Sequence, residues 1–257
     1  MKRAARFELS IKNGMVLVGS DAHYWPSKKP STAHRAFVAL AKEYQPEAIV
    51  FNGDVIDGTS ISRHARIGWE YQPTVREELD VAHERLLEIE KSAPRAKRIW
   101  TLGNHDARFE MRLAEVAPQY ADVPGIHLKD HFPLWVPAWS VFVNRNTAIK
   151  HRWKGGVHAA VNNTKDSGLS TVTGHLHALN VAAYTDYTGT RFGVDGGTLA
   201  DPMGPQFSNY TEDNPLNWRS GFVVLEYVNG KLQWPDVAFV QDERKGLVRF
   251  RGKTWSV

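Results

Sequence analysis

The stretch TLGNHDAR, residues 101–108, places a histidine between two side chains that can bind metal or accept protons. Asn104, His105 and Asp106 follow directly on an apolar run, and Arg108 comes two residues later. A turn explains the Gly-Asn pair but does not require the histidine. We therefore expect this segment to do chemistry, with Arg108 as a guanidinium that can clamp two phosphate oxygens.

Similar polar groups follow four other strand-like runs: MVLVGS, AIVFNG, TAIKH and LSTVTG. In open α/β sheets, sites form at the carboxyl ends of strands, so groups far apart in the sequence can converge there. In two pairs, Asp21 with His23 and His175 with His177, one residue separates the members. In an extended backbone both members of such a pair would point the same way. The groups are Asp21, His23, Asp54, His151, His175 and His177.

With Asn104, these residues make seven candidate metal ligands. Seven are too many for one tetrahedral ion with an open position, but they suit two ions that share a bridging carboxylate. Imidazole, carboxylate and amide ligands favour Mn²⁺, Fe, Zn or Co over Ca or Mg, but they do not choose among those four. Of these ions we expect Mn²⁺. Two aspartates against two divalent ions leave a net positive charge, which predicts an anionic substrate.

The elements that must position these groups alternate between strands and helices in the first two-thirds of the chain. Buried strands are predicted at residues 15–20, 47–52 and 97–102. Between them, apolar residues recur at helical spacing in 31–44 and 74–91, and Thr74 with Glu77 forms a capping box. This order implies a parallel sheet with right-handed crossovers.

The later part of the chain changes to strand-like runs, which predict a mixed or second sheet. The runs begin at residue 140, and VNGK at 228–231 is a hairpin turn signal within them. Two segments rich in proline, tryptophan or polar residues, 118–139 and 201–219, are expected to be irregular loops.

Composition sets the class of protein. The 257 residues are 42% hydrophobic and 23% charged, which is typical of a folded globular chain. The net charge of +4 favours anionic partners but falls short of a nucleic-acid-binding stripe. There is no cysteine, so thiolate metal sites are excluded. No stretch reads as a secretory signal or a membrane span, so a cytoplasmic protein without membrane association is expected.

The motifs in their order along the chain resemble the calcineurin-like metallophosphoesterases, most closely their compact bacterial and phage-type members. Those motifs are Asp21-x-His23, Gly53-Asp54, GNHD at 103–106, a downstream His151 and GHLH at 174–177. The resemblance implies an α/β fold, a four-layer αββα sandwich of two mixed β-sheets flanked by helices. It implies one domain over 1–257, a site for two metal ions at one edge, and hydrolysis of phosphomonoesters or phosphodiesters.

Carried over by motif, one ion would be held by Asp21, His23, Asp54 and His177. The other would be held by Asp54, Asn104, His151 and His175, with Asp54 as the bridge. His105 would lie near the leaving-group oxygen, with Asp106 orienting or polarising it. His158 is the alternative to His151, which we prefer because it directly ends a strand run. Asp57 is as readily a turn residue as a catalytic one.

The predicted mechanism is in-line attack at phosphorus by a hydroxide that bridges the two ions, with His105 protonating the departing alkoxide. Nucleotides or nucleic acids are candidate substrates. The alternatives are a phosphatase of small monoesters or phosphoproteins, and a non-catalytic scaffold of the same fold. Arg108 and Asn104 are the candidate substrate contacts.

Several further residues could line the substrate channel or stack on a base. For the cationic ones a surface role is the stronger expectation, and for the aromatic ones packing is, because nine tryptophans must pack somewhere. They are Arg63, His64, Arg152, Tyr24, Trp25, Trp135, Trp139 and Trp218.

Overall fold

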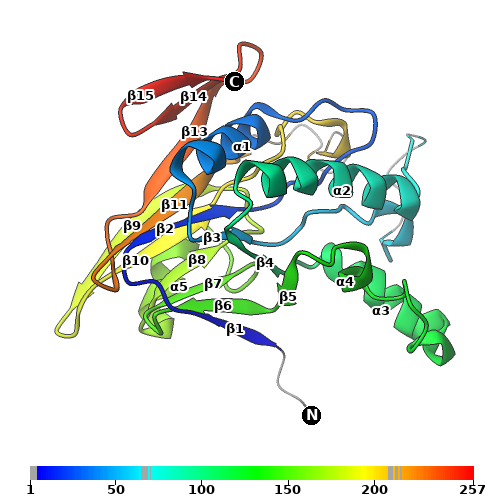
Figure 1. Cartoon of the computed structure of the whole chain (residues 1–257), viewed down its shortest axis with the longest axis horizontal. Coiled ribbons are helices and arrows are strands. Elements are labelled where there is room, and N and C mark those ends of the chain that lie inside the picture. Colours follow the sequence, from blue (N-terminus) through cyan, green and yellow to red (C-terminus); the bar gives the residue numbers. More distant parts are fainter. Residues whose placement is uncertain (1–4, 65–68, 70, 208–210, 212–213, 215) are drawn as a thin grey trace.

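Two mixed β-sheets lie face to face, and helices cover their outer faces (Figure 1). The structure, a computed structural model, describes residues 5–64, 69, 71–207, 211, 214 and 216–257. The order of layers is helix, sheet, sheet, helix, so the predicted αββα sandwich is confirmed.

The larger sheet contains the three strands predicted in the first part of the chain. Its central strands run parallel to one another, and β11 joins them antiparallel to β2. In spatial order the strands are β15 (Lys253–Ser256), β14 (Leu247–Phe250), β13 (Asp236–Asp242), β11 (Gly221–Val228), β2 (Gly14–Gly19), β3 (Ala48–Phe51), β4 (Lys97–Thr101) and β5 (Val136–Ala138), with β12 (Lys231–Leu232) paired to β11.

The smaller sheet is built mainly from the later strand-like runs. It mixes parallel and antiparallel pairs, as expected from the hairpins and crossovers of that part of the chain. In spatial order its strands are β1 (Arg6–Leu9), β6 (Ser140–Val143), β7 (Thr147–Lys150), β8 (Ser170–Thr173), β10 (Gly189–Gly196) and β9 (Leu179–Asp186).

Two helices cover the larger sheet and one packs on the smaller sheet. They are α1 (Thr32–Tyr44) and α2 (Val75–Ser92) on the former, and α5 (Ala159–Ser167) on β8, β9 and β10. The predicted capping box at Thr74 is present. Because successive strand side chains face opposite ways, Leu17 joins the core under α1 and α2, while Val16 and Val18 join the core between the sheets.

The segment 118–139 was expected to be irregular, but it contains a short helix, α4 (Leu128–His131), and the edge strand β5. It follows α3 (Asp106–Val116), which projects from the body (Figure 1). In segment 201–219 a 3₁₀ turn spans Pro205–Phe207, and residues 208–210, 212–213 and 215 lie outside the described residues.

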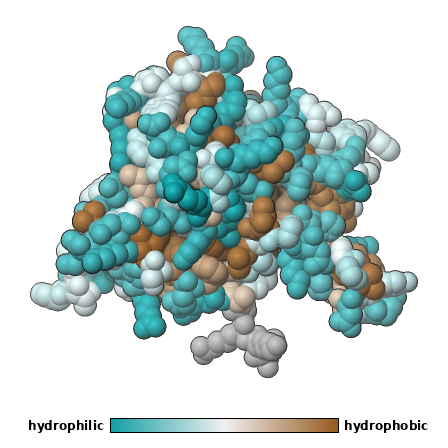
Figure 2. All heavy atoms as spheres, viewed as in Figure 1, coloured by the Kyte–Doolittle hydropathy of each residue, from teal (hydrophilic) through white to brown (hydrophobic). Residues whose placement is uncertain are grey.

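Hydrophilic residues cover most of the face shown in Figure 2, and hydrophobic ones show between them in several places on the body, with a small patch at the projecting end of α3. None of the helices in the described part of the chain has both the length and the apolar character that a bilayer span requires.

Candidate metal centre

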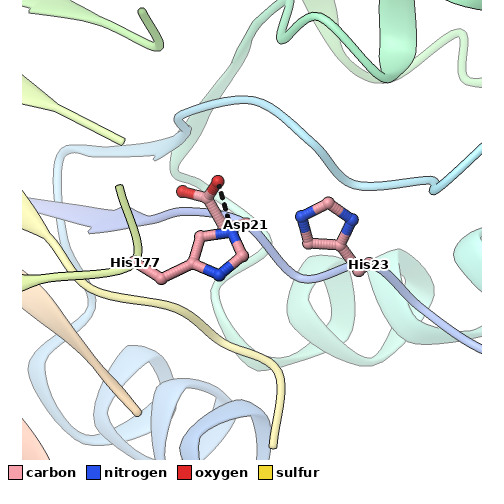
Figure 3. A group of neighbouring side chains, drawn as sticks. All are labelled: Asp21, His23 and His177. Atoms are coloured by element: carbon pink, nitrogen blue, oxygen red, sulfur yellow. Dashed lines mark ion pairs between the residues drawn. The ribbon is translucent and has the colours of Figure 1, made fainter. Parts of the chain in front are cut away.

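The ends of β2 and β8 bring three of the candidate ligands together (Figure 3). One potential ligand atom each from Asp21, His23 and His177 lies within 4.8 Å of the other two. His177 Nε2 is 3.2 Å from Asp21 Oδ1, and all three residues are buried. Residues separated by about 150 positions in the sequence therefore form one compact group.

A second group forms where β3, β7 and β8 end. Asp54, His151 and His175 also offer ligand atoms within 4.8 Å of one another. His151 Nε2 is 3.0 Å from Asp54 Oδ2. The alternative residue, His158, is exposed at the first position before α5, so the structure places His151 and not His158 beside Asp54.

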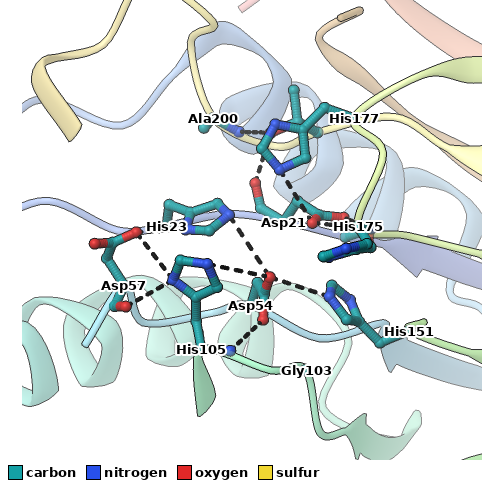
Figure 4. A network of polar contacts seen from close by, with 12 residues as sticks. Asp21, His23, Asp54, Asp57, Gly103, His105, His151, His175, His177 and Ala200 are labelled. Carbon is teal, nitrogen blue, oxygen red and sulfur yellow. Dashed lines mark hydrogen bonds and ion pairs between the residues drawn. The ribbon is translucent and has the colours of Figure 1, made fainter. Parts of the chain in front are cut away.

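Asp54 lies between the two groups (Figure 4). Its Oδ2 is 3.0 Å from His151 Nε2 and 3.9 Å from His23 Nε2, while its Oδ1 accepts the backbone N–H of His105 at 2.9 Å. A Cβ at Gly103 would lie 2.0 Å from Asp54 Oδ1, so only glycine lets the GNHD loop approach this carboxylate.

Five of the candidate ligands have a left-handed backbone, which non-glycine residues rarely adopt. The expectation of extended Asp-x-His and His-x-His pairs is therefore wrong. Each strand turns sharply at its end, so the turn rather than the two-residue strand repeat aims the side chains inward. Such conformations cost about 1–3 kcal/mol each and concentrate at functional sites. The φ values are 53° for Asp21, 40° for His23, 52° for Asp54, 72° for His175 and 55° for His177.

Hydrogen bonds fix the tautomers of two buried imidazoles. His151 Nδ1 is 2.8 Å from the carbonyl of Asn52, which can only accept, so Nδ1 carries the proton. His23 Nδ1 likewise faces the Asp57 carboxylate at 2.9 Å. Nε2 of His23 and Oδ1 of Asn104 are buried without a hydrogen-bond partner, and Nε2 of His151 faces only the Asp54 carboxylate among the described residues. Leaving such atoms unpaired costs about 1–3 kcal/mol each, so a cation bound there would satisfy them.

The electrostatics of the site favour added positive charge. Burial raises the pKa of Asp54, but the neighbouring His151, with His105 and His23, more than offsets this and keeps the carboxyl ionised. Burial lowers the pKa of His151, yet the carboxylates of Asp21 and Asp54 raise it to about 10. Without a metal, these carboxylates thus draw a proton onto His151, which is the response expected of a cation site.

His105 is oriented by Asp57 and not by Asp106. His105 Nδ1 donates to the Asp57 carbonyl at 2.7 Å and lies 3.2 Å from its carboxylate, which leaves Nε2 facing Asp54 at 4.0 Å. Burial lowers the pKa of His105, but the hydrogen bond to Asp57 and the charges of both aspartates outweigh it and raise this pKa. Asp106 was expected to orient or polarise His105, and that expectation is wrong.

Asp106 instead joins the loops that follow β3 and β4. Its Oδ2 accepts N–H groups from Asp54 at 2.8 Å, Gly103 at 2.8 Å and the Trp100 indole at 2.9 Å. Its Oδ1 accepts from Val55 at 2.9 Å. Because a buried N–H must find an acceptor, this carboxylate fixes the position of Asp54 relative to the GNHD loop.

We expect Asp106→Asn to destabilise the fold by about 3 kcal/mol, because the amide turns an N–H donor towards donors that the carboxylate satisfied. The measurement is chemical denaturation at pH 8, above the value of about 6 to which burial and Asp54 raise the pKa of Asp106. Asp130→Asn is the matched control, because Asp130 accepts backbone N–H groups at an exposed position. Equal, small losses in the two variants would contradict the joining role of Asp106.

One buried carboxylate of the site had no signal in the sequence. Glu78, in the first turn of α2, accepts the backbone N–H groups of Asp57, Gly58 and Thr59 at 2.9, 2.6 and 3.2 Å. Burial raises the pKa of Glu78 to about 7. Glu78 therefore holds the loop that presents Asp57 to His23 and His105.

The remaining expected residues divide between the site and the core. Arg108 NH1 donates to the Asp57 carbonyl at 2.9 Å, and its NH2 lies 3.4 Å from His105 Nε2, so this guanidinium borders the site. Trp218 packs against His177 with ring centroids 4.3 Å apart. Tyr24 and Trp135 are buried in the core, as the packing alternative predicts, and Trp139 is exposed.

The sequence profile of the calcineurin-like phosphoesterase family matches residues 15–184. None of the curated proteins compared with the chain is significantly similar to it.

Solved structures of low sequence identity are also similar to the chain. Zn²⁺-complexed Vps29 of Entamoeba histolytica is 13% identical with a TM-score of 0.48, and covers 94% of this chain and 98% of its own. Vps29 of Chaetomium thermophilum is 10% identical with a TM-score of 0.46, at 94% and 98% coverage. A predicted phosphoesterase of Streptococcus pneumoniae TIGR4 is 14% identical with a TM-score of 0.36, at 96% and 99% coverage.

Proposed function

This chain belongs to the calcineurin-like phosphoesterase family, and we propose that it hydrolyses phosphoester bonds with two divalent metal ions that share Asp54. The observation that carries the proposal is the orientation of His23 and His151. Each ring donates its Nδ1 proton outward, to Asp57 or to Asn52, and turns Nε2 towards Asp54, at 3.9 Å for His23 and 3.0 Å for His151. Metal-binding histidines are held by hydrogen bonds of this kind.

The proposed ligand sets follow the two groups of side chains. One ion is assigned to Asp21, His23, Asp54 and His177, and the other to Asp54, Asn104, His151 and His175. These nitrogen and oxygen ligands favour Mn²⁺, Fe, Zn or Co, and we propose Mn²⁺. Bound there, two cations supply Lewis-acid charge that lowers the pKa of water and neutralises phosphoryl oxygens.

The chain's own residues supply the proton for the leaving group. Because Nδ1 of His105 donates to the Asp57 carbonyl, the proton that the imidazolium can give up is on Nε2, which faces the centre. His105 is the proposed general acid, and Asp57 holds the ring in that orientation. Arg108 is the proposed contact to a phosphoryl oxygen, with its guanidinium held by the Asp57 carbonyl.

Removal of the metal ions is expected to abolish hydrolysis reversibly. After EDTA treatment and desalting, turnover of bis-p-nitrophenyl phosphate and p-nitrophenyl phosphate should fall to the background. It should return with Mn²⁺ and not with Mg²⁺, because imidazole nitrogens bind Mg²⁺ poorly. Release of p-nitrophenolate is the measurement.

Circular dichroism before and after chelation is the control that separates loss of metal from loss of fold. Hydrolysis that survives complete chelation would contradict a metal-dependent reaction. Absence of turnover with every ion and both substrates would favour a non-catalytic scaffold of the same fold.

A further inference from the structure

A cationic cleft opens beside the metal centre on the side of Asn104. It has a volume of about 220 Å³, and none of its described lining residues is acidic. The cleft runs between the 3₁₀ turn Thr59–Ile61 and α3, and Arg152 closes it from the segment after β7. Its polar lining consists of Arg63, His64, Asn104, Arg108, Arg112 and Arg152.

The positive charge of this cleft is only partly balanced. Arg63 and Arg112 share a single carboxylate, that of Glu115, at 2.9 and 3.1 Å. Arg152 has no carboxylate within ion-pair distance among the residues that the structure describes. The side chain of Arg63 is 64% exposed, so its guanidinium can turn to a ligand at little cost.

The cleft adjoins the reaction site through two residues. Asn104 lines the cleft and also belongs to the proposed ligand set. Arg108 lines the cleft as well, and its NH2 lies 3.4 Å from His105 Nε2. His105 is the proposed donor to the leaving group. A substrate whose leaving group extends past His105 would therefore enter a cleft lined by guanidinium groups.

We propose that this cleft binds a second phosphate on the leaving-group side of the substrate, and hence that the substrate is a chain of linked phosphates. The inference rests on the proposed function, because it takes the direction of the leaving group from His105. Arginine presents a planar fork that fits phosphate oxygens, and several such forks beside one reaction centre suit a repeated anion better than a single phosphomonoester. A single-stranded polynucleotide and an inorganic polyphosphate share this chemistry.

The test is binding of a fluorescent dodecathymidylate with phosphorothioate linkages, which keep the charge and resist hydrolysis. The variant is Arg63→Gln with Arg152→Gln, and the matched control is Lys231→Gln with Lys253→Gln, exposed residues of β12 and β15. Anisotropy with Mn²⁺ present should show Kd about tenfold weaker for the arginine variant alone. The slope of log K against log salt concentration is negative, and its magnitude should decrease by about 1.4 in the arginine variant. The two removed arginines each contribute about 0.7 through one phosphate contact to a single strand.

Tripolyphosphate as a competitor distinguishes the two sources of linked phosphates. Competition by tripolyphosphate that the arginine variant weakens supports a polyphosphate ligand, and oligonucleotide binding that tripolyphosphate barely displaces supports a polynucleotide. Equal Kd and equal salt slope in wild type and the arginine variant would overturn the inference. The binding measurement does not depend on turnover. If the proposed hydrolysis failed, the binding result would still test whether the cleft holds a second phosphate.

Discussion

Asp54→Asn is expected to lose both metal ions and to reduce kcat/KM by about 10³-fold or more. The carboxylate faces ligands of both sets, His23 and His151, and an amide offers a single weak oxygen donor in its place. Without the two ions the transition state loses several kcal/mol of charge stabilisation. Each loss of about 1.4 kcal/mol slows the reaction tenfold, which gives this magnitude. Metal content by mass spectrometry and hydrolysis of bis-p-nitrophenyl phosphate are the two measurements.

Asp166→Asn is the matched control for this substitution. Asp166 forms a surface ion pair with Lys154, so the same chemical change there should leave metal content and turnover within about twofold of wild type. An Asp54→Asn protein that keeps both ions would contradict the bridging role, whatever its activity.

His105→Asn is expected to keep both ions and lose about 10²- to 10⁴-fold in kcat on a substrate with a poor leaving group. The loss should come from the missing proton donor, since His105 Nε2 is 4.0 Å from Asp54 Oδ2 and is not assigned as a ligand. With p-nitrophenolate, which leaves without protonation, the loss should be within about tenfold. The measurement is kcat for an alkyl and a p-nitrophenyl ester of phosphate.

Asp57→Asn is the companion variant, because it keeps His105 but removes the charge that faces Nδ1. With metal content matched to wild type, because Asp57 also holds His23, it should show the same dependence on the leaving group with a smaller loss. Equal losses on both esters in the His105→Asn protein would mean that His105 does not act as the general acid.

The central strands and the two helices that cover them were predictable because their patterns are local. The parallel strands β2, β3 and β4 are buried on both faces and read as continuous apolar runs, while α1 and α2 show apolar residues at helical spacing. Residues 228–231 likewise form the expected hairpin turn, with Asn229 at φ 50° and Gly230 at φ 76°.

The helix α5 was missed because its pattern carries little signal. Its sequence, AAVNNTKDS, is polar apart from its first turn, and only Ala159, Ala160, Asn163 and Thr164 are buried. Contact with the smaller sheet, rather than periodicity, fixes this helix. The strands β14 and β15 were also missed, although they form a local hairpin in which Phe250 lies opposite Lys253 across the turn at Arg251 and Gly252.

Within the site, the sequence identified which residue types meet but not how they are held. A pattern such as Asp-x-His does not reveal whether the backbone is extended or left-handed, and here it is left-handed. Likewise, Asp106 adjoins His105 in sequence, yet its carboxylate points to the backbone of the neighbouring loop, and Asp57 takes the expected role. Adjacent side chains on a helix start diverge by about 100°, so sequence proximity does not imply contact.

The central claim is that two cations lie on either side of Asp54, and anomalous diffraction from crystals grown with Mn²⁺ tests it most directly. We predict two peaks, one against Asp21, His23 and His177 and the other against Asn104, His151 and His175. A single peak, or manganese bound only elsewhere in the molecule, would contradict the claim.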